Sequence, residues 1–173
     1  LVENFRVGGF ARLGFDEDVA ENFFFGAAIG APFTSITDDA SKVIYFTPRF
    51  SGFQLGASFT PDGGQTGFTR DLDNDGDSES IINLAANYVG KFGDVGFSVG
   101  GAWWNGEGEV AAGAAGGTTT NDVEMWRLGA KVDFAGFSVS GAYMDLGKTG
   151  VTSARSATGE DAGEYWTVAA SYT

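Results

Sequence analysis

The sequence contains neither cysteine nor histidine. Without cysteine the chain has no disulfide framework, no thiolate metal site and no cysteine nucleophile. Without histidine it has no Ser-His-Asp triad, no imidazole general base and no histidine-ligated zinc site. Carboxylates alone could still perform acid-base chemistry, but no spacing singles out a catalytic pair among the acidic residues. The composition therefore disfavours an enzyme.

Long apolar runs and basic residues are also scarce. No segment approaches the ~18–20 consecutive apolar residues that a membrane-spanning helix needs. The chain carries 10 basic and 23 acidic residues, a formal net charge of −13, and so lacks the basic surface that nucleic acid requires. Its 173 residues indicate a single domain.

Glycine and phenylalanine are abundant instead, with 28 and 16 residues. Between positions 53 and 60 apolar side chains alternate strictly with polar or small ones, which is typical of a strand with one apolar and one polar face. We predict strands over the following segments: 42–50, 53–61, 80–91, 95–105, 123–133, 137–146 and 164–173.

Two kinds of connection separate these segments. The short ones contain glycine and predict tight hairpin turns, at Ser51-Gly52, Phe92-Gly93-Asp94 and Phe134-Ala135-Gly136. The long ones are polar and cover residues 62–79, 106–121 and 147–162. Short turns at one end and long loops at the other are the layout of an outer-membrane β-barrel. The predicted strands of about 10–12 residues also suit a tilted membrane strand, which needs ~9–11.

The fold that we predict is therefore all-β, an antiparallel transmembrane β-barrel. On the polar faces of its strands lie isolated basic residues, which we assign to the wall of the lumen: Lys91, Arg127 and Lys131. Aromatic residues near the strand ends suit the girdles found at membrane interfaces: Phe92, Phe97, Trp103, Phe134, Phe137 and Tyr143. A soluble β-sandwich also alternates, but its strands are usually shorter, at ~5–6 residues.

The first forty residues differ from the rest. Residues 5–15 alternate and predict one strand, with Arg6 and Arg12 on its polar face. Regular alternation then stops until Lys42, and a connection of that length without periodicity is commonly functional. One strand before this segment and seven after it give a total of about eight.

Residues 42–62, KVIYFTPRFSGFQLGASFTPD, resemble a signature of the general porins of alphaproteobacteria. In that family the pattern Y-F-T-P-R-F-x-G-F-x-L-G-x-S-[YF]-x-P-D follows the constriction loop. The upstream passage GGFARLGFDEDVAENFFFGAAIGAP matches the family's strand-then-loop region more loosely. The resemblance implies that residues 16–40 fold inward as the constriction loop of a single porin domain covering 1–173.

The resemblance also implies a function, a location and partners. The chain is expected in the bacterial outer membrane, in a homotrimer in contact with lipid and lipopolysaccharide, as a water-filled channel for passive diffusion of small hydrophilic solutes and ions. A porin of this kind has about sixteen strands, so the chain is expected to be an internal part of one. The alternative is a complete eight-stranded barrel without a pore, with a structural or adhesion role.

In such porins, acidic residues of the loop face basic residues of the wall across the constriction. A transverse field of this kind orders water and selects among charged solutes. The candidates in this sequence are Asp16, Glu17, Asp18, Glu21, Asp38 and Asp39 on the loop, with Arg6, Arg12 and Arg49 on the wall. For Asp38 and Asp39, an equally good explanation is that they only keep the end of the loop solvated.

One further motif lies in the loop that follows residue 62. Asp71, Asp73 and Asp75 precede Gly76 with the spacing of the first half of a calcium loop, and Asp77 and Glu79 follow. Ile82 stands where that motif needs its bidentate glutamate. No cofactor is required by the predicted function, and calcium is the metal that this pattern suggests. The alternative is a solvated acidic loop tip.

Overall fold

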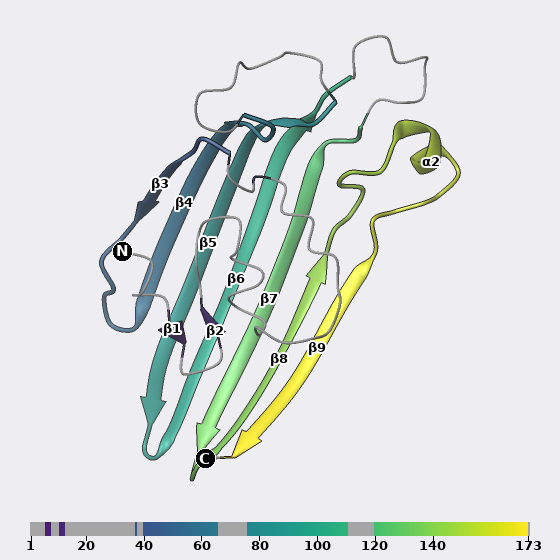
Figure 1. The fold of residues 1–173 in the computed structure, drawn as a ribbon. Coiled ribbons are helices and arrows are strands. Elements are labelled where there is room, and N and C mark those ends of the chain that lie inside the picture. The colour runs from purple at the N-terminus through teal and green to yellow at the C-terminus, as the bar shows by residue number, and fades with distance from the viewer. Residues whose placement is uncertain are drawn as a thin grey trace.

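The computed structural model describes residues 6–7, 11–12, 37, 40–65, 76–110 and 120–172. Its main feature is one antiparallel sheet of 7 strands that follow one another in chain order (Figure 1). The strands are β3 Val43–Phe46, β4 Phe53–Asp62, β5 Ser78–Phe92, β6 Val95–Gly108, β7 Val123–Phe134, β8 Phe137–Asp145 and β9 Glu164–Tyr172. The all-β, antiparallel prediction is therefore confirmed. In the described ranges, no helix has the length and apolar character needed to cross a membrane.

Tight turns join the strands at one end of the sheet, which we call the turn end. Ser51-Gly52 and Ala135-Gly136 have positive φ at both residues, 47° and 90° in the first and 51° and 84° in the second. This is the conformation of the two-residue turns whose twist matches that of the flanking strands. At Gly52 a Cβ atom would also clash with the carbonyl oxygen of Val89, so glycine is required there. The sequence predicted both turns.

The long connections lie at the other end, the loop end, and the described parts of them are tied together. The backbone N–H of Glu109 donates to the carbonyl of Asp77 at 2.9 Å, which links two of the loops. Asn121, in the same β6–β7 loop as Glu109, donates from its backbone N–H and from its side chain to the carbonyl of Val151 in the β8–β9 loop, at 3.0 and 2.7 Å. A short helix that the sequence did not predict, α2 Ser153–Ala157, lies in the loop between β8 and β9 (Figure 1).

The N-terminal strand was predicted wrongly. Instead of one strand over residues 5–15, the structure has two strands of 2 residues, β1 Arg6–Val7 and β2 Ala11–Arg12, which pair antiparallel. The chain therefore reverses direction between them, and Arg6 is the register partner of Arg12. The sequence between the two strands contains Gly8 and Gly9, and paired glycines favour turns over extended strands.

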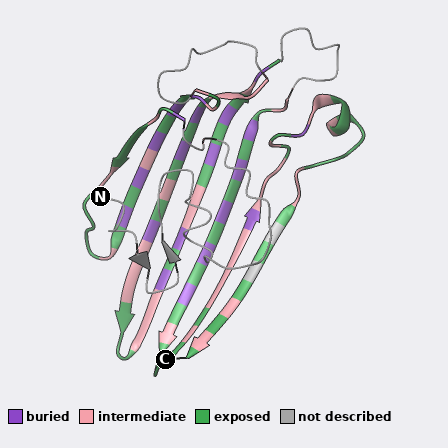
Figure 2. Ribbon diagram, viewed as in Figure 1, coloured by how far each residue is buried: buried purple, intermediate pink, exposed green. Residues whose placement is uncertain are grey.

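Buried and exposed residues alternate along the strands of the large sheet (Figure 2), and the two faces differ in chemistry. Along β7 buried and exposed residues alternate from Val123 to Val132, so that every second side chain is shielded. The shielded side, which we call the buried face, holds polar and charged residues: Gln54, Ser58, Thr60, Asn83, Asn87, Ser98, Arg127 and Lys131. The opposite side, the exposed face, holds large apolar residues: Phe53, Leu55, Phe59, Ile82, Leu84, Val99, Trp103, Trp126, Leu128, Val132, Val139, Trp166 and Val168. A soluble sheet has the reverse arrangement.

Candidate functional site

The buried face is built from polar side chains separated by very small residues. Register pairing places Gly56, Ala85 and Ala102 side by side on three neighbouring strands, and Arg127 follows on β7. Because glycine and alanine rise little above the backbone, they leave lateral space beside the long arginine side chain. The next row towards the turn end again combines polar side chains with very small residues on neighbouring strands: Gln54, Asn87, Gly100 and Gly129.

Arg127 is the most deeply shielded basic residue described on this face, with 3% of its surface exposed. Its guanidinium carbon lies 5.0 Å from the ring centroid of Trp104, within the range of a cation–π interaction. The alternation of β6 explains the contact, because Trp103 points to the exposed face and Trp104 to the buried one. The sequence pattern indicated Arg127 as a wall residue. Trp104 was missed, although the period of two in β6 assigns it to the polar side.

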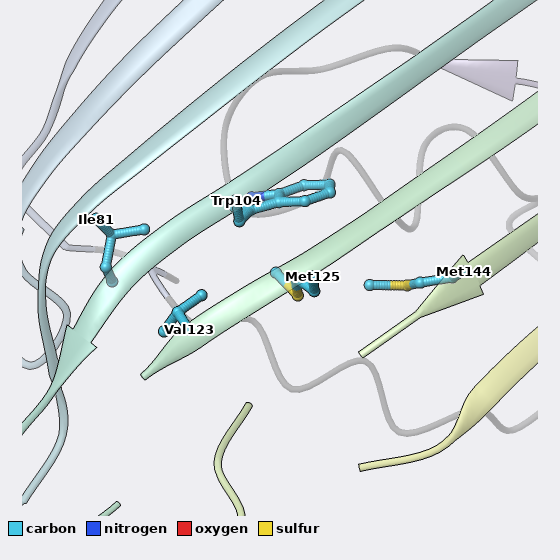
Figure 3. Packing of buried hydrophobic residues seen from close by; sticks show 5 residues of the cluster. All are labelled: Ile81, Trp104, Val123, Met125 and Met144. Atoms are coloured by element: carbon cyan, nitrogen blue, oxygen red, sulfur yellow. The ribbon is translucent and has the colours of Figure 1, made fainter. Parts of the chain in front are cut away.

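Trp104 also belongs to an apolar cluster on the buried face near the loop end. The cluster consists of Ile81, Trp104, Val123, Met125 and Met144, contributed by β5, β6, β7 and β8 (Figure 3). Val123 is fully buried and Ile81 is 1% exposed. On β5 to β8 the buried face thus changes along the strands, from apolar near the loops to polar and small-residue nearer the turns.

Lys131 lies on the buried face four residues beyond Arg127, about 13 Å along the strand at ~3.3 Å per residue. Its Nζ forms an ion pair of 2.8 Å with a carboxylate oxygen of Asp133, which also accepts a hydrogen bond from the Ser138 hydroxyl. The third predicted wall residue, Lys91, is exposed at the turn end of β5, opposite Gly96. All three predicted wall residues thus have the parity of the polar face, with Arg127 and Lys131 shielded on β7 and Lys91 exposed two strands away at the turn end.

Arg49 lies in the connection between β3 and β4, at the turn end. It donates to the carbonyl of Gly52 at 2.6 Å and to the side-chain oxygen of Gln54 at 3.0 Å. Gln54 in turn donates to the carbonyl of Thr47 at 3.0 Å, so the group braces the hairpin. Partial desolvation lowers the pKa of Arg49, which nevertheless stays protonated at neutral pH.

The remaining predicted constriction residues fall largely outside the described ranges. This applies to Asp16, Glu17, Asp18, Glu21, Asp38 and Asp39. Arg6 and Arg12 are described only through the pairing of β1 with β2. The assignment of these eight residues to a constriction stays a prediction.

Two of the five predicted calcium ligands, Asp77 and Glu79, are described, and Asp71, Asp73 and Asp75 are not. The Asp77 carboxylate packs directly against Gly64, because a Cβ atom added there would clash with its Oδ2 atom. Glu79 is the register partner of Asp62 on β4 and of Glu107 on β6. Within the described ranges no group of three acidic side chains is placed to hold a metal ion. The calcium site stays a prediction.

The exposed face carries aromatic residues in two bands. Towards the loop end lie Trp103, Trp126 and Trp166, and at the turn end lie Phe92, Phe134, Phe137 and Tyr172. From Trp126 to Phe134 is eight residues, about 26 Å along the strand at ~3.3 Å per residue. A tilt of ~40° reduces this to a height of about 20 Å, close to the ~25 Å apolar band of an outer-membrane barrel.

Comparisons with known proteins agree with this geometry. A family model described as Gram-negative porin matches residues 3–173. An uncharacterized protein of Rickettsia felis is 45% identical to the chain over 38 residues, which cover 22% of this chain and 9% of that protein. No solved structure matches the chain.

Proposed function

The chain belongs to the Gram-negative porin family, and from this premise we propose that it lines a water-filled channel for passive diffusion of small hydrophilic solutes and ions. Membership of the family places the protein in the bacterial outer membrane. A pore of this kind breaks no covalent bond. Its selectivity depends on the width of the lumen and on the electric field across it.

The observation that supports a pore is the chemistry of the two sheet faces. An arginine on the lipid side of an outer-membrane strand costs roughly 2–4 kcal/mol at the bilayer midplane. In β7 both Arg127 and Lys131 avoid that side, while Leu128 and Val132 occupy it. The polar face, with its rows of glycine and alanine, suits the wall of an aqueous lumen.

We propose residues 16–40 as the constriction loop, supported by the resemblance of the segments on both sides of it. In this proposal the loop carboxylates oppose the basic wall residues, with Arg127 and Lys131 added to Arg6, Arg12 and Arg49. Opposed charges across a narrow lumen orient water and favour dipolar solutes. The excess of acidic residues favours a weak preference for cations.

The test is conductance of the full-length protein in planar lipid bilayers. We expect stepwise ohmic currents, and in a KCl gradient across the bilayer a reversal potential of the sign that indicates cation preference. Protein unfolded by heating before addition serves as the control. A folded barrel that gives no current would support the complete eight-stranded alternative, and clear anion selectivity would contradict the proposed charge distribution.

A homotrimer is the second part of the proposal, and it depends on the family resemblance alone. We expect chemical cross-linking of outer membranes, without extraction, to give a ladder that ends at three copies. A ladder that stops at one copy would contradict the trimer and leave the pore itself unaffected.

A further inference from the structure

The charged residues of the large sheet are distributed unevenly along its strands. In the half of the described sheet that runs from the middle of the strands to the turn end, basic residues outnumber acidic ones. The basic residues are Arg49, Lys91, Arg127 and Lys131, and the acidic ones are Asp94 and Asp133. Asp133 pairs with Lys131, and Asp94 lies in the turn between β5 and β6. The wall of this half therefore keeps an excess of positive charge.

At the loop end, carboxylates gather where β4, β5 and β6 leave the sheet. Asp62, the last residue of β4, is 5% exposed, and Glu79 is its register partner on β5. A Cβ atom at Gly64 would meet carboxylate oxygens of both Asp62 and Asp77, so these two carboxylates border the same glycine. Glu109 is buried as well, and its backbone N–H donates to the carbonyl of Asp77. This end of the buried face is therefore negative.

Acidic residues also predominate in the rest of the loop end. The other acidic residues described there are Glu107, Asp122, Glu124, Asp145, Glu160, Asp161 and Glu164, and the described basic ones are Lys42, Lys148 and Arg155. The two signs of charge are separated along the strands. Asp62 is six residues from Gly56, whose row contains Arg127, and this is about 20 Å at ~3.3 Å per residue. The charges thus oppose each other along the lumen instead of across it.

From this separation we infer that the pore rectifies: it passes more ionic current when the compartment facing the loop end is positive than when it is negative. The inference rests on the proposed function, because it requires ions to cross the lumen. Fixed charges concentrate ions of the opposite sign, so cations gather at the loop end and anions in the turn-end half. A positive loop side drives both populations into the lumen and raises its ion concentration. A negative loop side drives both populations out and depletes it.

Single-channel currents of the full-length protein at equal voltages of opposite sign test the inference. The measured quantity is the current ratio, the current with the loop side positive divided by the current with the loop side negative. In ~10 mM KCl the Debye length of ~30 Å lets the fixed charges act across the lumen, and we expect a current ratio of roughly two. In ~1 M KCl the Debye length of ~3 Å screens them, and the current should be ohmic.

The side of the bilayer that faces the loop end has to be identified for each inserted protein. Ala157, the last residue of α2, is exposed in the loop between β8 and β9, and the chain has no cysteine. Ala157→Cys therefore accepts a biotin label at the loop end. Streptavidin added to one compartment identifies the loop side by the change in current that its binding causes.

Two lysine variants make the same change in net charge at opposite ends of the sheet. Lys91→Gln removes a positive charge from the turn end, and Lys148→Gln removes one from the loop between β8 and β9; both side chains are exposed. In low salt Lys91→Gln should reduce the current ratio from about two to about 1.5, whereas Lys148→Gln should not reduce it. A fall in both variants would mean that net charge and not its position along the strands sets the ratio, and the inference would be wrong.

Two pairs of acidic residues separate the faces of the sheet at the loop end. Glu79→Gln combined with Glu109→Gln removes charge beside Asp62 and Asp77, and the current ratio should fall towards one. Glu124→Gln combined with Glu164→Gln removes the same charge at the same end but on the exposed face, and it should change the ratio less. Equal effects of the two pairs would overturn the assignment to the buried face.

Heat-modifiable migration on gels verifies that each variant forms a barrel before its currents are measured. Equal currents at the two polarities in low salt would overturn the inference and leave the proposed pore unaffected. A larger current with the loop side negative would also overturn it, because the charges would then be arranged in the opposite order. Absence of current from the folded protein at either polarity would contradict the proposed pore, and the inference with it.

Discussion

The exposed and buried faces of the sheet are made by the same strands, often by neighbouring residues, yet they meet opposite environments. In β7, Leu128 is 56% exposed while Arg127 beside it is 3% exposed. In a soluble protein the hydrophobic effect would reverse these values, because apolar surface leaves water at a gain of ~25 cal/mol per Å². In a porin the exposed face meets lipid. Its apolar side chains therefore leave water by contacting lipid instead of a protein core. Burial alone therefore does not identify a core.

The largest test of this comparison places the same charge on each face. Ala130→Arg puts a guanidinium on the exposed face of β7, and Ala142→Arg puts one on the opposite face of β8, where Gly129 is the register partner. We expect Ala130→Arg to lower the free energy of unfolding by about 2–4 kcal/mol and Ala142→Arg by under about 1 kcal/mol. Urea titration of the protein in phospholipid vesicles measures both. Equal losses of unfolding free energy would mean that the two faces do not contact different environments.

Alternation in the sequence predicted much of the difference between the two faces, because a period of two can be recognised within one strand without knowing its neighbouring strands. It gave the strands from Val43 to Tyr172, and the short glycine-containing connections gave the three tight turns, to within a few residues. It also assigned Arg127 and Lys131 to the polar side. A few apolar-polar periods in a row are enough to fix the face of each later residue in the same strand.

Features that depend on neighbouring strands could not be predicted in this way. The row of Gly56, Ala85 and Ala102 beside Arg127 exists only once the registers of β4 to β7 are known. The pairing of β1 with β2 was missed because alternation continues on both sides of the reversal. The position of Trp104 on the buried face follows from the period of two in β6, but its contact with Arg127 also depends on the register between β6 and β7.

A second test asks whether the loop acids act on the polar lumen. Asp16→Asn, Glu17→Gln and Asp18→Asn together remove three negative charges from the proposed constriction. A unit charge acting over ~7 Å of water is worth about RT, a factor of about 2.7, so three together should change the cation-to-anion permeability ratio by about twentyfold towards anions. Reversal potentials in a KCl gradient measure the ratio. An unchanged ratio would remove residues 16–18 from the constriction.

A third, smaller test concerns the arginine of the buried face. Arg127→Gln removes one positive charge from the proposed wall, and the permeability ratio should rise about two- to threefold towards cations. Lys148→Gln, an exposed charge in the loop between β8 and β9, is the control and should have less effect. The variant also removes the contact with Trp104, so its unfolding should be measured in parallel. If Arg127→Gln and Lys148→Gln change the permeability ratio equally, Arg127 lies outside the conducting path.

The smallest expected effect is calcium binding by the loop between β4 and β5. Half of a calcium motif, completed by carbonyls and water, should bind with a dissociation constant of about 10⁻⁴–10⁻³ M, as extracellular sites do. Part of this loop is already held by protein contacts, since the Asp62 carboxylate accepts hydrogen bonds from the N–H groups of Gly64 and Gln65 at 2.7 and 2.9 Å. Calcium would therefore stabilise a loop whose base is fixed. Calorimetric titration measures the binding, with Asp73→Asn as the variant that should lose it. Absence of heat at millimolar calcium would leave the acidic residues as a solvated tip at the loop end, with no part in either face of the sheet.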